Sequence, residues 1–353
     1  MIYLDHAAMT PPLPAALDAF RSAPFGNPSS EHAVGHAARA ALEQAREKIA
    51  ALLDCAPEEI YFTSTATEAA ALASYSLIEN GYGIDVCEME HHAVSENADA
   101  FRFPRSVTWP KDSFARMLAK NETGELFPSP VGADAPGGPQ KPLWLCDATA
   151  AVGHIPVSFR NLECTYMLFD AIKFGGVPGA AALVARKNVA PLSPLIRGGG
   201  QERGMRSGTE NVPAVCAMAA ALEWQTEHMQ MNSFKLSSLS DEMRIELSKI
   251  DGIQWNTDFA KPHLPHILNV SFPGVDAHAL TLLLSKEGVM VSAGAACSNG
   301  LNEPSHVLMA MFHDEARARS AIRISLSHEN TVEEIRIAAE KIKDAVAYLR
   351  SLT

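Results

Sequence analysis

The sequence lacks the cysteine patterns of a disulfide-bonded or zinc-binding protein. Its 353 residues include six cysteines, and no two of them form a Cys-x-x-Cys pair. Scattered cysteines of this kind argue against a zinc ribbon or a disulfide framework and fit a reducing compartment. Most of them stand in apolar runs, where a cysteine is usually a small core residue. We therefore predict no metal site.

Long apolar runs and an excess of positive charge are also missing. The longest apolar candidate, residues 212–224, is too short to span a bilayer. Residues 1–6 show neither the basic region nor the apolar core of a signal peptide. Lysine and arginine number 29 against 41 acidic residues, which gives a net charge of −12. This balance argues against nucleic acid or an anionic membrane as a main partner, and we expect a cytoplasmic protein.

What the sequence does contain is the pattern of an α/β protein. Hydrophobic residues make up 47% of the chain, and its length suits about two domains, each with its own core. Short apolar runs at 143–147, 166–170 and 180–185 predict strands, and 35–53 is the clearest amphipathic helix. Strands separated by helical patterns indicate a mostly parallel sheet covered by helices.

A second domain is predicted after an alanine-rich helix that runs from about residue 211 to 228. A polar stretch at 230–233 suggests the boundary. The large domain is expected over 14–229, and a smaller α+β domain over 1–13 and 230–353. Its predicted elements are strands at 267–272, 289–292 and 322–326 and helices at 277–286 and 332–349.

A lysine on a tight turn is the first candidate for chemistry. The apolar run 167–169 ends at Asp170, Lys173 follows, and several glycines turn the chain before the next strand. A lysine held at a sheet edge can present its amine to a cofactor aldehyde, because desolvation lowers its pKa and makes it nucleophilic. The alternative is a lysine that merely extends into solvent, and the residues of this stretch alone favour that alternative.

A second candidate is the start of the helix expected at 64–73, which follows a strand at 60–63. Thr65 and Glu68 have the spacing of a capping box. The free N–H groups and the dipole of a helix start favour a phosphate, although many ordinary helices begin in this way. Asp147 and Asp170 also follow strands, and the carboxyl ends of parallel strands are where such sheets place their sites.

The order of the motifs carries a resemblance to a known family. The chain resembles cysteine desulfurases of the NifS/IscS-like group, in the class V aminotransferase family of fold type I pyridoxal phosphate (PLP) enzymes. The resemblance covers the chain nearly end to end. Its motifs are Tyr3-Leu-Asp5, Gly26-Asn-Pro-Ser-Ser30, the segment 62–68, Glu90-His-His-Ala-Val94, Cys146-Asp-Ala-Thr149, residues 152–156, Lys173, the glycine-rich segment 198–211, Leu268-Asn-Val-Ser-Phe272, Ala296-Cys-Ser298 and residues 322–326.

This resemblance implies a large PLP-binding domain with a mostly parallel, seven-stranded-type sheet. It assigns Lys173 as the lysine that binds PLP covalently, and Asp147 as the partner of the pyridinium nitrogen, which keeps the ring an electron sink. His91 corresponds to the histidine that stacks on the ring and moves protons; without its motif it would be read as a core histidine. Ala66 and Thr67 correspond to the helix start that binds the phosphate.

Further roles follow from the same resemblance. Thr209 corresponds to a threonine that reaches the phosphate of the other subunit, which implies a homodimer with shared sites. Asn121 corresponds to a residue near the ring hydroxyl. Arg323 corresponds to the arginine that grips the substrate carboxylate, a task suited to a guanidinium, and Asn27 is a second substrate-binding candidate. Cys297 lies among small residues in the loop of the smaller domain and corresponds to the catalytic nucleophile.

The implied reaction converts L-cysteine to L-alanine. Lys173 removes the α-proton, and the Cys297 thiolate attacks the substrate sulfur to leave a persulfide. A persulfide is reversible, so its sulfur can pass to an acceptor protein, for example in iron–sulfur cluster assembly.

Several expected cofactor contacts differ from the family pattern. The usual Ser-x-His-Lys reads Asp170-Ala-Ile172-Lys173, and Ala150 replaces a glutamine. Two like charges ~4 Å apart repel by about 4 kcal/mol at an effective dielectric near 20, which would weaken cofactor binding about a thousandfold. Three outcomes are open: Asp170 points away from the phosphate, Arg203 or Arg206 neutralises it, or PLP binds poorly.

Two other functions stay open. A degenerate member of the fold, with weak or no catalysis, could act as a binding or regulatory subunit, and a selenocysteine lyase-like enzyme would share the fold. The sequence also shows no apolar strand just before Asn121, and the Pro/Gly-rich stretch 128–142 predicts a surface loop.

Overall fold

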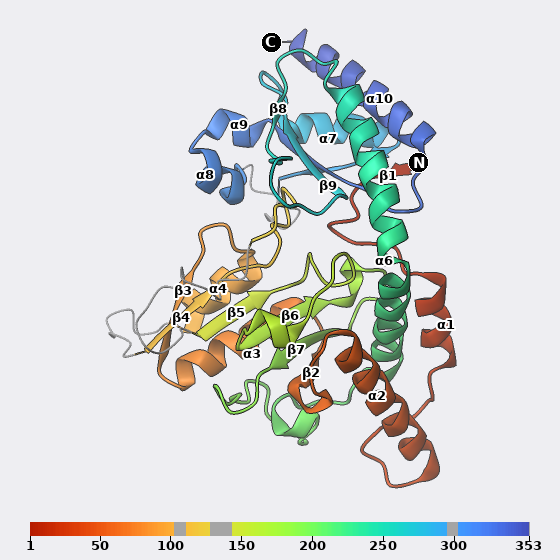
Figure 1. The fold of residues 1–353 in the computed structure, drawn as a ribbon, viewed down its shortest axis with the longest axis vertical. Coiled ribbons are helices and arrows are strands. Elements are labelled where there is room, and N and C mark those ends of the chain that lie inside the picture. The colour runs from red at the N-terminus through yellow and green to blue at the C-terminus, as the bar shows by residue number, and fades with distance from the viewer. Residues whose placement is uncertain (102–110, 128–142, 295–302, 353) are drawn as a thin grey trace. The chain divides into compact units, whose positions relative to one another are not determined.

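The computed structural model describes residues 1–101, 111–127, 143–294 and 303–352. The chain divides into two compact units (Figure 1). The larger unit consists of Pro11–Leu118 and Phe127–Glu227, and the smaller unit of Met1–Thr10, Ala119–Leu126 and His228–Thr353. The segment 119–126, which interrupts the larger unit, contributes to the smaller one, and no sequence pattern predicted this. The stretch 128–142 lies outside the described residues.

A six-stranded sheet forms the centre of the larger unit, in the order β2-β7-β6-β5-β4-β3. The strands β3, β4, β5 and β6 are mutually parallel, and β7 is antiparallel to both β6 and β2. The expectation of an α/β fold with a mostly parallel sheet is therefore confirmed, but the described residues form six strands in this sheet where the resemblance implied a seven-stranded type. The strands are β2 (Ile60–Thr63), β3 (Tyr82–Val86), β4 (Lys111–Ala115), β5 (Leu143–Asp147), β6 (Tyr166–Asp170) and β7 (Ala181–Ala185).

The strand β4 supplies the strand that the sequence did not show as an apolar run before Asn121. It lies between β3 and β5 and pairs with both in parallel register. Its sequence contains lysine, aspartate and serine, so it does not read as an apolar run. Ser113 nevertheless belongs in the sheet because its hydroxyl donates to the carbonyl of Gly83. Ser113 and Ala115 of the strand are buried, and Met117 and Leu118 continue the buried positions beyond it.

Helices cover the sheet because each presents one apolar face to it. In α3 (Ala66–Glu79) the buried residues Leu72 and Leu77 pack with Ile84, Leu145 and Leu168 of the strands. Burying side chains of this size stabilises the fold by roughly 1.5–3 kcal/mol each. The other helices of this unit are α1 (Pro14–Ser22), α2 (Ala33–Leu52), α4 (His92–Phe101) and α5 (Phe159–Leu162).

The helix α6 (Val212–Leu247) is longer than predicted. It continues through residues 230–233, where the sequence suggested a boundary. The polar residues of that stretch include neither glycine nor proline, and methionine, glutamine and asparagine are tolerated in a helix at a cost of a few tenths of a kcal/mol each. Polarity alone therefore did not end the helix.

The smaller unit combines two short sheets with helices. In one sheet β1 (Ile2–Tyr3) pairs in parallel with β10 (Val289–Met290). In the other the order is β11-β12-β9-β8, and its pairs are antiparallel. The remaining elements are β8 (Gln254–Trp255), β9 (Ile267–Ser271), β11 (Ser292–Ala293), β12 (Ala321–Ser325), α7 (Ala277–Lys286), α8 (His306–Phe312), α9 (Glu315–Arg319) and α10 (Val332–Arg350).

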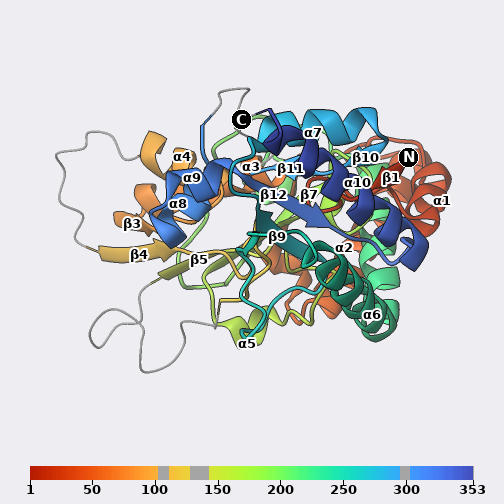
Figure 2. The same cartoon turned by 90° about the horizontal axis from the view of Figure 1, so that it is seen from above.

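An apolar core holds this smaller unit together. The helices α7 and α10 pack against each other, as both views show, and contribute Leu280, Leu284, Ile335 and Ile342 to one buried cluster (Figure 2). Within the described residues, none of the helices is both long enough and apolar enough to cross a membrane.

Candidate cofactor and substrate sites

The register of the larger sheet places the predicted cofactor residue Asp147 beside two other residues at the carboxyl ends of strands. Thr63 of β2 and Asp170 of β6 both pair with Ala181 of β7, so they flank the same residue. On the next strand, Asp147 pairs with Leu168. The parallel strands β5 and β6 thus end in aspartates on neighbouring strands, as the sequence predicted.

Lys173 ends a single 3₁₀ turn, η2 (Ala171–Lys173), that follows β6 directly. Lys173 is half-buried, and its backbone carbonyl oxygen is 3.0 Å from His154 Nε2. Gly175 then turns the chain with φ of +87°, and a Cβ there would lie 2.6 Å from Leu13 Cγ. Only glycine therefore fits this close approach, which fixes the turn that carries the lysine.

The helix α3 begins as the capping pattern predicted, with one difference. Thr65 is the N-cap, and its Oγ1 accepts a hydrogen bond from the Glu68 amide at 3.2 Å. The Glu68 carboxylate, however, accepts from the Ser64 amide at 2.8 Å and not from Thr65. It also pairs with Arg206, with 2.6 Å between Arg206 Nε and Glu68 Oε1. Thr67 is exposed in the first turn.

Asp170 lies against this helix start. Its Oδ2 accepts from the Ala66 amide at 2.9 Å, and its Oδ1 accepts from the Ile172 amide at 3.2 Å. Asp170 is buried, with 5% of its surface exposed. Burial raises the pKa of Asp170, the two amide bonds and the Lys173 charge lower it, and the Asp147 charge raises it.

These contacts bear on two of the three outcomes left open for Asp170: its direction and its neutralisation by an arginine. The carboxylate does not point away from the expected phosphate position, because it is bound to the first amide of α3. Arg206 pairs with Glu68. The Arg203 guanidinium lies over the Tyr61 ring, 4.2 Å from its centroid, and donates to the Ile60 carbonyl. Both arginines are thus engaged elsewhere.

Asp147 is buried at the end of β5, with 8% exposure. Its Oδ1 accepts from the Thr149 amide at 2.8 Å, and Thr149 Oγ1 is buried without a hydrogen-bond partner in the described part of the chain. Glu90, 1% exposed, accepts a hydrogen bond from the Met117 amide. Burial, followed by repulsion from Asp147, raises the pKa of Glu90 well above its usual range.

His91 stands just before α4. Its Nδ1 accepts from the Ala93 amide at 3.1 Å, so the neutral ring carries its proton on Nε2. The residue is half-buried. The contact fixes which ring nitrogen accepts from the backbone. The predicted role of His91 toward a cofactor ring stays a prediction.

A buried ion pair anchors the glycine-rich loop to the body of the larger unit. Arg46 of α2 donates through Nη1 and Nη2 to Glu202 at 2.9 and 2.7 Å. Glu202 Oε2 also accepts from the Phe62 amide of β2 at 2.9 Å. Glu202 and Arg203 adopt left-handed φ values of +45° and +56°, a backbone conformation that costs roughly 1–3 kcal/mol and needs such an anchor.

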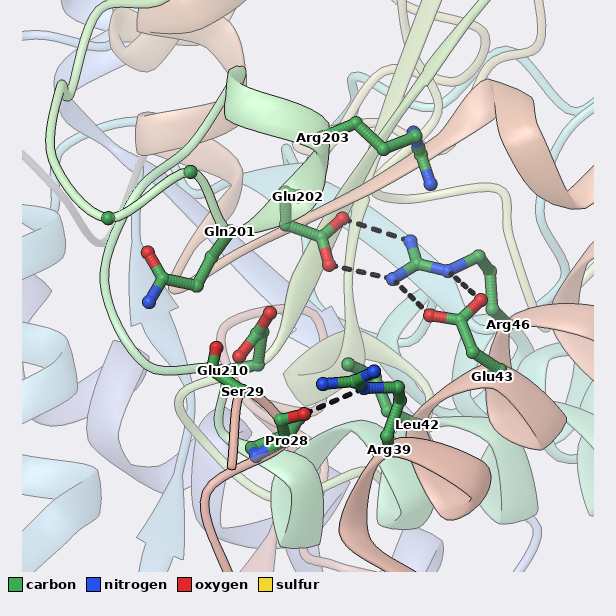
Figure 3. A pocket seen from close by; sticks show the side chains of 12 residues that line it. Pro28, Ser29, Arg39, Leu42, Glu43, Arg46, Gln201, Glu202, Arg203 and Glu210 are labelled. Atoms are coloured by element: carbon green, nitrogen blue, oxygen red, sulfur yellow. Dashed lines mark hydrogen bonds and ion pairs between the residues drawn. The ribbon is translucent and has the colours of Figure 1, made fainter. Parts of the chain in front are cut away.

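The same loop borders an open cavity of about 230 Å³ (Figure 3). Figure 3 shows Glu202 directed at Arg46, with Glu43 bound to the other edge of that guanidinium. Sequence reasoning missed this pairing. Glu202 stands within the motif, but nothing in the sequence marks Arg46, a helical arginine, as its partner. Thr209, at the end of the loop, is exposed.

In the smaller unit, two of the predicted site residues contact each other. Arg323 is 2% exposed, and its Nη2 donates to Asp5 Oδ1 at 2.9 Å. Its Nη1 donates to the Asn121 carbonyl at 3.2 Å. Arg323 Nε and Asn121 Oδ1 are buried without hydrogen-bond partners among the described residues. Unpartnered buried polar atoms are costly, so these two favour a ligand here.

For the remaining predicted residues, Asn27 and Cys297, the structure gives no evidence of a role in the site. Asn27 is exposed and its Oδ1 accepts from the Ser29 amide at 2.9 Å, which forms a local turn. Cys297 lies outside the described residues.

Comparison with known proteins identifies the family. The model of the class-V aminotransferase family matches residues 2–108 and 112–337, and the chain belongs to this family. A curated relative is the cysteine desulfurase of Enterobacter agglomerans, 36% identical over 380 residues, which cover 100% of this chain and 94% of the relative. The IscS-like cysteine desulfurase of Mycobacterium tuberculosis is 35% identical, covering 99% and 97%.

A solved structure shares the fold. A NifS-like protein superimposes with a TM-score of 0.89 at 32% identity, covering 98% of this chain and 99% of that one. The resemblance read from the motifs is therefore confirmed, both for the NifS/IscS-like group and for the α/β fold.

Proposed function

We propose that this protein is a PLP-dependent cysteine desulfurase. The observation that carries the proposal is the end-to-end similarity to cysteine desulfurases, together with Asp147 at the end of β5 and Lys173 on the turn after the adjacent strand β6. Enzymes of this family are generally PLP-dependent. In this proposal L-cysteine is the substrate, and the chain works as a homodimer in which Thr209 reaches the partner's site.

The residues present fit the ring of PLP. Asp147 is buried and held by the Thr149 amide, which suits an anion that pairs with a pyridinium nitrogen. The unpartnered Thr149 Oγ1 is a further polar atom that a ligand would satisfy. Lys173 would hold the aldehyde carbon. At the phosphate end the helix start of α3 is present, and Thr67 lies in its first turn, but the Ala66 amide binds Asp170.

Each of the chain's own residues then has a defined task. PLP, when bound, supplies an electron sink for the carbon next to the amino group. Lys173 Nζ takes and returns the proton at that carbon. Arg323 binds the substrate carboxylate. The Cys297 thiol, whose role rests on its sequence context, forms a bond to the substrate sulfur while the carbon–sulfur bond breaks, so L-cysteine and thiol become L-alanine and a persulfide.

The test of this proposal is alanine release. The protein incubated with PLP and L-cysteine is expected to release alanine in many turnovers when a thiol accepts the persulfide sulfur. The same assay with L-selenocysteine separates the lyase alternative: activity on selenocysteine, with none on cysteine, would contradict the proposal. No alanine from either substrate would favour the degenerate alternative, which the changes at Ala150, Asp170 and Ile172 suggest.

Changing Arg323 to lysine is expected to raise the KM for L-cysteine about 10- to 100-fold, with a smaller effect on kcat. Lysine keeps the charge but loses the planar fork that binds a carboxylate through two hydrogen bonds. Hydrogen bonds to charged groups contribute about 1.5–3 kcal/mol each. Steady-state kinetics measure the effect.

Because Arg323 is buried against Asp5, a melting temperature must accompany the kinetics. The Asp5→Asn variant is the matched control: it weakens the internal ion pair and keeps the guanidinium. An unchanged KM in Arg323→Lys would show that Arg323 serves the fold alone.

A further inference from the structure

A carboxyl group of the same chain, that of Asp170, binds the start of helix α3. The Ala66 amide, in the first turn of this helix, donates to Asp170 Oδ2 at 2.9 Å. First-turn amides of a helix have no partner within the helix and carry part of its positive dipole, so they are the groups that bind a phosphate. In this structure, a carboxylate at 5% exposure holds that position. The carboxylate is also fixed from the other side, by the Ile172 amide at 3.2 Å.

Charges of both signs lie around Asp170. Lys173, three residues further on, lowers the pKa of Asp170, whereas Asp147 on the neighbouring strand β5 raises it. In the first turn of α3 the charged group is Glu68, which is paired with Arg206. Burial is the largest influence and raises the pKa of Asp170, so proton uptake by this carboxyl is easier than in water.

We propose that Asp170 is an internal competitor of the cofactor phosphate, so that PLP binds with uptake of one proton by the Asp170 carboxyl. This inference rests on the proposed function, since it concerns the same site. The ionised carboxylate repels the phosphate and occupies the Ala66 amide. The protonated carboxyl carries no charge, and its O–H can donate a hydrogen bond to a phosphate oxygen. The proton comes from solvent.

The sign of the pH dependence follows. Below the pKa of Asp170 the carboxyl is neutral, and the affinity for PLP is highest. As the pH rises through that pKa, each further unit costs up to a tenfold loss of affinity, because binding then requires proton uptake. A variant without the Asp170 carboxyl should not show this loss of PLP affinity with rising pH. Aspartate at this position would thus make cofactor loading sensitive to pH.

The matched variant is Asp170→Asn, which keeps the size of the side chain and an oxygen that can accept from Ala66. Binding of PLP, pyridoxal and inorganic phosphate is measured by equilibrium dialysis from about pH 6 to 9. This range includes the second phosphate ionisation of the two ligands that carry a phosphate. Calorimetry in two buffers of different ionisation enthalpy counts the protons taken up. Melting temperatures verify folding, and Asp170→Ser serves as a second variant.

At about pH 8 the Asp170→Asn variant is expected to bind PLP on the order of 100-fold more tightly than the wild type, from removal of a like charge at close range. Inorganic phosphate should gain in the same direction, and pyridoxal, which has no phosphate, should change by less than about twofold. The wild type should take up one more proton per PLP than the variant.

Equal PLP affinity and equal proton uptake in wild type and variants would overturn the inference, and so would an equal gain for pyridoxal. A different result would contradict the proposed function. If PLP and pyridoxal bind to none of the proteins, the cofactor assignment is wrong, while the phosphate arm still reports whether Asp170 excludes an anion from α3.

Discussion

The Lys173→Ala variant is expected to lose the visible absorbance band that the wild type develops with PLP, and its rate of alanine formation is expected to fall about a thousandfold or more. Lys173 ends the turn that follows β6, and the proposed function has its amine reach the cofactor aldehyde from there. Alanine has neither the amine for the covalent link nor a group that can take the α-proton. Absorbance spectra during PLP titration measure the first effect, and the alanine assay measures the second.

The matched control is Lys187→Ala. Lys187 is exposed, with 54% of its side chain accessible, and its ion pair with Glu58 lies at the surface. This variant should show the same visible band as the wild type. A Lys173→Ala protein that is folded and still develops the band would show that another amine holds the cofactor.

The Arg46→Ala variant is expected to lower the free energy of unfolding by about 3–5 kcal/mol, the usual effect of leaving one partner of a buried ion pair without its counter-charge. Arg46 and Glu202 have side-chain exposures of 3% and 1%, and Glu202 also binds the Phe62 amide. The loss should loosen the loop that ends at Thr209. Urea unfolding measures the stability.

Two comparisons make this result interpretable. Arg160→Ala removes an exposed ion pair with Asp54, with exposures of 73% and 45%, and should cost less than about 1 kcal/mol. The double variant Arg46→Ala, Glu202→Ala should be destabilised by less than the sum of the single variants, because no charge remains buried alone. Additive effects would contradict a direct coupling between the two residues.

Local patterns in the sequence predicted most of the elements. Three short apolar runs became the buried strands β5, β6 and β7, and the Thr65 cap became the start of α3. These features depend on neighbours in the chain. The strand β4 was missed because its lysine, aspartate and serine interrupt the apolar pattern. Its backbone pairing with β3 and β5 and its buried Ala115 hold it in the sheet.

The hydrogen-bond partner of Asp170 could not be predicted from the sequence. Its contact with Ala66 joins residues 104 positions apart, and it depends on the register of β2, β7 and β6. The Arg46–Glu202 pair spans 156 positions. Such contacts arise only once the sheet has brought distant segments together. The motif predicted that the site would be altered at Asp170, and the structure shows its carboxylate bound to the first amide of α3.

The most direct test of the account is a single turnover on Cys297. The PLP-loaded protein, mixed with one equivalent of L-cysteine labelled at sulfur and without an acceptor thiol, should yield one alanine and one labelled persulfide per active site, located on the peptide that contains Cys297 by mass spectrometry. The Cys297→Ala variant should bind PLP with the same visible band and form neither product. Alanine formed in equal amount by Cys297→Ala, or a label on another cysteine, would contradict the account.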